Sequence, residues 1–127
     1  VSFTSIFPAC YAGRWPHIHF EVFNSLEAVV AGDDARLTSQ IALPQDACQQ
    51  VFAHDPGYAR SVRNFSEVSL DSDNVFGDGW DAELASVTGD PASAMTIALT
   101  IGVAEKSANI PAPGGGLPPG GPGRPAR

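Results

Sequence analysis

Residues 16–23 alternate between polar and apolar side chains, and this alternation restricts the fold more than any other feature of the sequence. The polar positions are His17, His19 and Glu21, and the apolar positions are Ile18, Phe20 and Val22. Successive side chains of a β-strand point to opposite faces, so the pattern predicts a strand with one buried apolar face. Such a strand needs a second layer against which that face can pack.

Four other segments also have strand character. Val1 to Phe7 is rich in β-branched and aromatic residues, Arg36 to Leu43 alternates, and Trp80 to Val87 follows a loop-like segment from Asp71 to Gly79. The longest alternation runs from Met95 to Val103. Several short strands separated by turn signals predict an all-β fold, in this case a β-sandwich.

Helices are expected to be few and peripheral. After Pro44 the apolar residues recur at helical spacing, at Ala47, Cys48, Val51 and Phe52. A short helical turn is also predicted at Tyr58 to Val62. We therefore expect one β-sandwich domain over residues 1–104. Residues 105–127 are rich in Pro and Gly with almost no apolar side chains, which predicts a disordered tail.

Charge and hydropathy exclude two classes of partner. The net charge is −7, from 14 acidic and 7 basic residues. A phosphate backbone or an anionic membrane surface requires a basic protein surface, so we expect no nucleic acid and no membrane partner. No apolar run approaches the roughly 20 residues of a transmembrane helix. Because the chain starts with Val1 in a strand-like segment, we expect it to be a fragment or a processed chain.

The polar face of the strand predicted at 16–23 contains candidate metal ligands. Positions i and i+2 of a strand share a face, about 7 Å apart along the chain, so His17 and His19 can present two imidazoles to one metal. Imidazole suits Zn, Cu, Fe and Ni. Tyr11 lies just upstream across a Gly-containing turn, and its phenolate is a hard donor suited to Fe(III). Arg14 adds a positive charge that can stabilise an anionic substrate.

These residues resemble a known family. The sequence Phe7-Pro8-x-x-Tyr11-x-Gly13-Arg14-x-Pro16-His17-Ile18-His19-Phe20 is similar to the signature of the intradiol ring-cleavage dioxygenases, the catechol and protocatechuate dioxygenase-like enzymes. Leu37-Thr38-Ser39-Gln40 is similar to the next strand of that family. Ser61-Val62-Arg63-Asn64 and Ser72-Asp73-Asn74-Val75-Phe76 resemble its secreted bacterial branch. The resemblance covers the C-terminal portion of the family.

The resemblance implies an activity and a set of roles. Tyr11, His17 and His19 match ligands of a non-haem Fe(III), and Arg14 and Gln40 match residues near the bound substrate. The implied reaction is cleavage of a catechol-type ring with O2 to a muconate-type product. A secreted or cell-envelope location is favoured over the cytoplasm, and a homodimer is compatible with the resemblance.

One departure from the family pattern bears on activity. The family takes a first tyrosinate from a strand upstream of this segment, and Tyr58, the other Tyr of this chain, lies in the wrong place for that role. The chain is therefore expected to hold three of the four protein ligands, to bind iron weakly and to turn over poorly.

Several alternatives stay open at this stage. The chain can be a non-catalytic β-sandwich binding module, or a zinc-dependent hydrolase that uses the histidine pair. Cys10 and Cys48 can be two buried thiols or a disulfide, and Trp15 can line a ring-binding pocket or cover the loop. His54 is interpreted as a helix-end residue and Glu21 as a solvent-exposed or ion-paired residue.

The aspartate-rich segment 71–79 superficially suggests a calcium loop. It lacks the Gly and the final Glu of an EF-hand, so it is interpreted as an ordinary loop.

Overall fold

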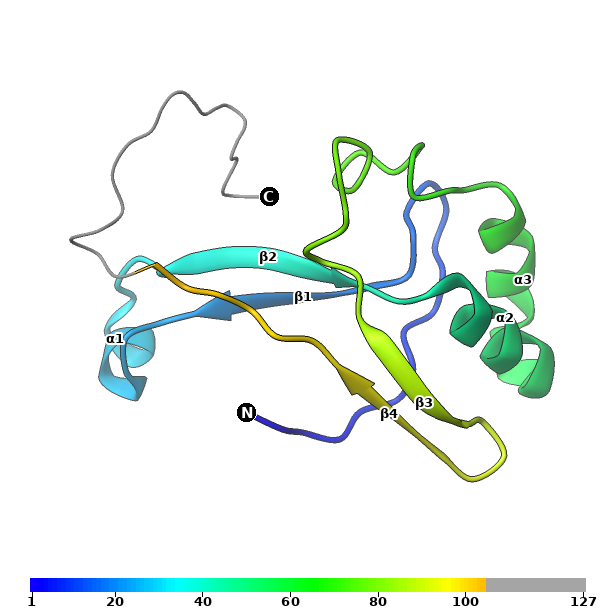
Figure 1. Ribbon diagram of the computed structural model, residues 1–127, viewed down its shortest axis with the longest axis horizontal. Coiled ribbons are helices and arrows are strands. Elements are labelled where there is room, and N and C mark those ends of the chain that lie inside the picture. Colours follow the sequence, from blue (N-terminus) through cyan, green and yellow to red (C-terminus); the bar gives the residue numbers. More distant parts are fainter. Residues whose placement is uncertain (105–127) are drawn as a thin grey trace. The chain divides into compact units, whose positions relative to one another are not determined.

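The computed structural model describes residues 1–104 (Figure 1). These residues belong to two compact units. Unit 1 comprises Val1–Ile18 and Ile41–Leu99, and unit 2 comprises His19–Gln40 together with residues 100–104. The tail predicted over 105–127 lies outside the described residues. Among the residues described, no helix has both the length and the apolar character that crossing a membrane requires.

The first sheet contains the strand predicted from the alternating pattern. Strand β1 (His17–Val22) pairs with β2 (Leu37–Ala42), and the two strands run antiparallel in Figure 1. They are joined by helix α1 (Leu26–Ala31), which was not predicted. Ser25 caps this helix by accepting a hydrogen bond from the Ala28 amide, and Gly32 ends it in the left-handed conformation, with φ of 78°.

The second sheet is a hairpin of β3 (Ser86–Asp90) and β4 (Ala94–Ala98). Gly89 faces Met95 in the antiparallel register and has φ of 88°. A Cβ atom at this position would collide with the carbonyl oxygen of Ala94, so this position requires glycine. The described residues thus contain two small antiparallel sheets and a few short helices.

The helices of unit 1 follow one another directly. Helix α2 (Gln45–His54) is followed by the 3-10 turn η1 (Pro56–Tyr58) and by α3 (Ala59–Ser66). The residues that α2 buries are the predicted ones: Ala47, Cys48, Val51 and Phe52. His54 is the exposed last residue of α2, as predicted. The predicted turn at 58–62 is confirmed and continues as a helix to Ser66.

Unit 1 has two clusters of buried residues. The first contains Cys10, Leu43, Cys48, Val51 and Phe52. The second contains Trp15, Ala42 and Phe76. Phe65 packs against both clusters, and its ring lies 4.9 Å from that of Trp15 and 5.5 Å from that of Phe52. Helix α3 therefore connects the two clusters.

Three strand predictions need correction. Val1 to Phe7 has no secondary structure, and Val1, Phe3 and Ile6 are exposed. Strand propensity is realised only where a neighbouring strand completes the hydrogen-bond ladder, and no described residue pairs with this segment. Residues 80–83 form a turn, so the strand predicted at 80–87 begins only at Ser86. The strand predicted at 95–103 is β4 and ends at Ala98.

Candidate functional site

Tyr11 and Arg14 lie on a tight turn just before β1. The Arg14 amide donates to the Tyr11 carbonyl at 3.2 Å, and Gly13 within the turn has φ of 84°. Glycine adopts this left-handed conformation without steric cost, which explains the Gly between Tyr11 and Arg14. The Tyr11 side chain is 56% exposed. A phenol that is open to solvent can reach an incoming ligand.

The Cys10 end of this turn is held by helix α3. Ser61 Oγ accepts a hydrogen bond from the Cys10 amide, and Asn64 Nδ2 donates to the Cys10 carbonyl, each at 2.9 Å. Ser61 is buried. The backbone N–H and the backbone carbonyl of Cys10 are therefore both hydrogen-bonded to side chains that lie more than fifty residues away in the sequence.

The Arg14 end is held by Asp73, which is 1% exposed. Its Oδ2 accepts hydrogen bonds from Arg14 Nε and from the Trp15 amide, both at 2.7 Å. Its Oδ1 accepts from the amides of Val75 at 2.7 Å and of Phe76 at 3.0 Å. Burial by itself would raise the pKa of Asp73, but the hydrogen bonds from Arg14 and the backbone amides outweigh it and hold the pKa below its ordinary value. Asp73 is therefore a charged and fully engaged carboxylate.

Trp15 belongs to the core and not to an open pocket. Its side chain is buried, its Nε1 donates to the Leu43 carbonyl at 2.7 Å, and its ring packs against Phe65. Trp15 was interpreted either as lining a ring-binding pocket or as covering the loop, and its burial agrees with the second interpretation.

His17 lies beside Tyr11, as predicted. The two ring centroids are 5.8 Å apart, and the rings meet edge to face at 66°. Nδ1 of His17 lies 2.6 Å from the Trp15 carbonyl oxygen. Because a carbonyl only accepts, Nδ1 carries the hydrogen, and the lone pair of the neutral ring is on Nε2. This is the arrangement in which a backbone carbonyl orients a metal-binding histidine.

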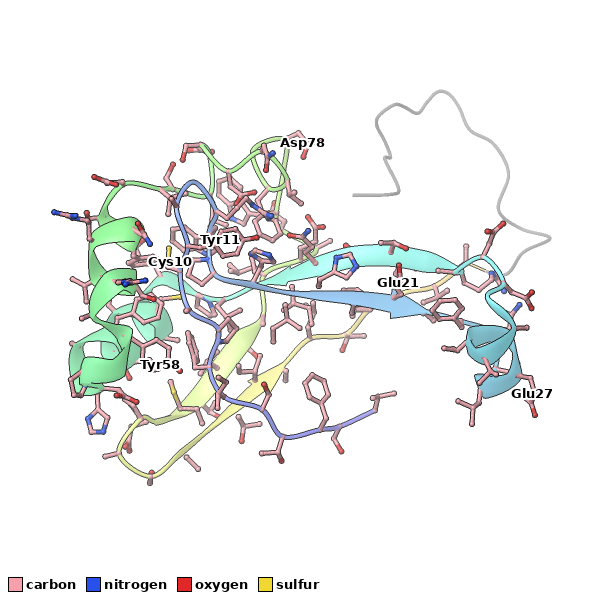
Figure 2. All side chains as sticks on the ribbon, turned by 180° about the vertical axis from the view of Figure 1, so that it is seen from behind. Cys10, Tyr11, Glu21, Glu27, Tyr58 and Asp78 are labelled. Carbon is pink, nitrogen blue, oxygen red and sulfur yellow. The ribbon has the colours of Figure 1, made fainter. Side chains whose placement is uncertain are left out.

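The other predicted residues belong to unit 2. His19 and Glu21 are exposed on β1, whereas Phe20 and Val22 are half-buried, so the predicted alternation is confirmed. Glu21 Oε2 accepts from Thr38 Oγ1 of β2 at 3.5 Å. Gln40 is half-buried on β2. Figure 2 shows Glu21 on the strand and Tyr11 on the preceding loop.

Tyr58 makes contacts within unit 1. Its hydroxyl donates to the Phe7 carbonyl at 2.7 Å, and its ring stacks on Phe52 at 5.4 Å. Burial, together with the charge of Asp55, raises the pKa of Tyr58. Tyr58 is the last residue of η1, directly before α3, and lies beside the helices in Figure 2.

Both cysteines are free thiols in buried positions, in agreement with the first of the two interpretations given to them. Burial raises the pKa of Cys10 to about 11. Burial and the neighbouring Cys10 and Asp46 raise the pKa of Cys48 further. Both groups are neutral at physiological pH.

The donor set is compatible with a ferric ion in its chemistry. A phenol and a carbonyl-oriented imidazole supply a hard oxygen donor and a nitrogen donor that iron accepts. Within residues 1–104, no cluster of three or more His, Cys, Asp and Glu side chains could hold a metal ion. Tyr11, the first ligand of the predicted set, is not one of these residue types.

The sequence patterns did not single out Asp73, which appears there only in the aspartate-rich segment 71–79 and in the stretch 72–76 that resembles the bacterial branch of the family. The available signal was an aspartate followed two and three residues later by the apolar Val75 and Phe76. This spacing is typical of a carboxylate that caps its own backbone turn.

Comparison with known proteins gave no assignment. No family model, curated protein sequence or solved structure matches the chain.

Proposed function

We propose that this chain is the C-terminal, iron-binding portion of an intradiol ring-cleavage dioxygenase built on a β-sandwich. The two small antiparallel sheets are compatible with part of such a sandwich. The proposed reaction cleaves a catechol-type ring with O2. When bound, Fe(III) would supply Lewis-acid chemistry and a template for the chelated substrate.

The observation that carries the proposal is the pairing of Tyr11 with His17. The Tyr11 and His17 rings meet edge to face with their centroids 5.8 Å apart, and the Trp15 carbonyl accepts from the Nδ1–H tautomer of the imidazole. His19, two residues later on β1, would complete the set of ligands. An exposed phenol beside an oriented imidazole leaves the Tyr11 oxygen accessible to a metal ion.

Arg14 and Gln40 are proposed to act on the substrate. The pairing of Arg14 Nε with Asp73 offsets the formal charge of the guanidinium. Arg14 is therefore proposed to act through oriented N–H donors and not as an isolated cation. Gln40 would supply a neutral amide for hydrogen bonding to a substrate oxygen.

The proposal is tested by titrating the purified chain with Fe(III) and recording visible absorption. Coordination of the Tyr11 phenolate should give a tyrosinate-to-iron charge-transfer band and a reddish colour. Tyr11→Phe should abolish the band. Tyr58→Phe is the matched control, because it removes the other tyrosine hydroxyl and should leave the band unchanged.

Activity gives the second measurement. With one tyrosine and two histidines as ligands, the chain should bind iron weakly and cleave catechol slowly. Absence of the band at saturating Fe(III), or a band that survives in Tyr11→Phe, would overturn the proposal. Tight zinc binding that tolerates Tyr11→Phe would favour a zinc hydrolase instead, and a chain that binds neither metal would favour a binding module.

A further inference from the structure

We infer that Asp73 is the positioning residue of this site: its buried carboxylate holds the turn that presents Tyr11 and orients the His17 ring. The inference rests on the proposed function, because that function gives the positions of Tyr11 and His17 their purpose. The positions themselves do not depend on a bound metal.

The first connection between Asp73 and His17 runs through the backbone of Trp15. The amide of Trp15 donates to Asp73 Oδ2, and its carbonyl oxygen lies 2.6 Å from His17 Nδ1. Trp15 therefore links Asp73 to His17, because its amide contacts the carboxylate and its carbonyl contacts the imidazole. The indole of Trp15 also donates to the Leu43 carbonyl, so Trp15 is held at both its amide and its side chain.

The second connection runs through the turn after Asp73. Oδ1 accepts from the Phe76 amide, and the Phe76 ring lies 6.5 Å from the His17 ring. Phe76 is fully buried, so it forms a fixed wall beside the imidazole. Asp73 therefore acts on His17 from two directions.

The third connection reaches Tyr11. Arg14 Nε donates to Asp73 Oδ2, and the Arg14 amide closes the turn on the Tyr11 carbonyl. A carboxylate that accepts from two donors on this turn and two on its own turn joins the two loops at one point. Its two partners on the first turn, Arg14 and Trp15, are the residues that lie between Tyr11 and His17 in the chain.

Two variants test the inference in the metal-free chain. Asp73→Asn keeps the shape but places an amide group against donors. Asp73→Ser keeps an oxygen that can cap the Val75 and Phe76 amides, but cannot also reach Arg14 and Trp15. Asp71→Asn is the matched control, because it removes one charge from an exposed position in the same loop.

The primary readout is nuclear magnetic resonance of the His17 ring. Wild type and Asp71→Asn should show the Nδ1–H tautomer of His17 and a cross-peak between the His17 and Tyr11 rings. Asp73→Asn and Asp73→Ser should lose the cross-peak and show a mixture of tautomers while remaining folded. Loss of an orienting partner typically weakens metal binding by about 10- to 100-fold, and Fe(III) affinity should fall in that range.

The outcomes separate this inference from the proposed function. If the cross-peak and the tautomer persist in the folded variants, Asp73 does not position the site. If both variants unfold while Asp71→Asn folds, its role is structural and the inference is overturned. If wild type never gives the charge-transfer band but the variants still lose the ring geometry, the inference stands and the dioxygenase proposal fails.

Discussion

Replacing Ser61 by alanine should measure how firmly helix α3 holds the Tyr11 turn. The Ser61 hydroxyl accepts the Cys10 amide at 2.9 Å, and both residues are 3% exposed. Alanine would leave that amide buried without an acceptor, which costs about 1–3 kcal/mol. Asn64 would still hold the Cys10 carbonyl and restrain the backbone next to the orphaned amide, so we expect the middle of this range, about 2 kcal/mol.

The assay is thermal and urea denaturation of Ser61→Ala beside wild type. For a chain of this size a loss of about 2 kcal/mol should lower the melting temperature by about 5–10 °C. Ser66→Ala is the matched control, because Ser66 is an exposed serine of the same helix, and its effect should stay within about 0.5 kcal/mol. A Ser61→Ala variant as stable as the Ser66→Ala control would refute the reasoning.

Two further predictions concern titrating groups. Because the folded pKa of Asp73 lies below its unfolded value of about 4, its contribution is present above that value and is lost as pH falls through the folded pKa. The free energy of unfolding should therefore decline in acid below about pH 4, and equal acid dependence in Asp73→Asn and wild type would contradict this origin. With a pKa of about 11, Cys10 should be alkylated at pH 8 roughly 100-fold more slowly in the native chain than in urea, as mass spectrometry can measure. Equal rates in the two conditions would show that the thiol is not protected.

The elements predicted correctly are those whose pattern comes from burial on one face. Strand β1 follows a period of two and α2 a helical period, and in both the predicted apolar positions are the more buried ones. Each pattern is local, since it depends only on which side of the element meets the core. The pairing of Tyr11 with His17 was predictable for the same reason, because only a short turn and the start of β1 separate them.

The elements predicted wrongly depend on information that is not local. Val1 to Phe7 has the composition of a strand, but composition does not supply a partner. Helix α1 carries a Ser25 cap and a terminal Gly32, yet it was missed because its apolar residues are mostly exposed and so give no one-sided pattern. Its local capping signals were present and would have been sufficient to find it.

The Tyr11–His19 motif contains the candidate ligands, but it does not predict which residues elsewhere in the chain hold this segment in place. Ser61, Asn64 and Asp73 lie 51 to 59 residues from the peptide groups and the side chain that they hold. No periodicity connects positions so far apart, and only the fold brings them to the turn. In the proposed site the Tyr11–His19 motif would supply the donor atoms, while hydrogen bonds from segment 58–76 hold the turn that contains them. It follows that transfer of the motif alone to another sheet would reproduce the residue types without the oriented imidazole, whereas transfer together with segment 58–76 should restore it.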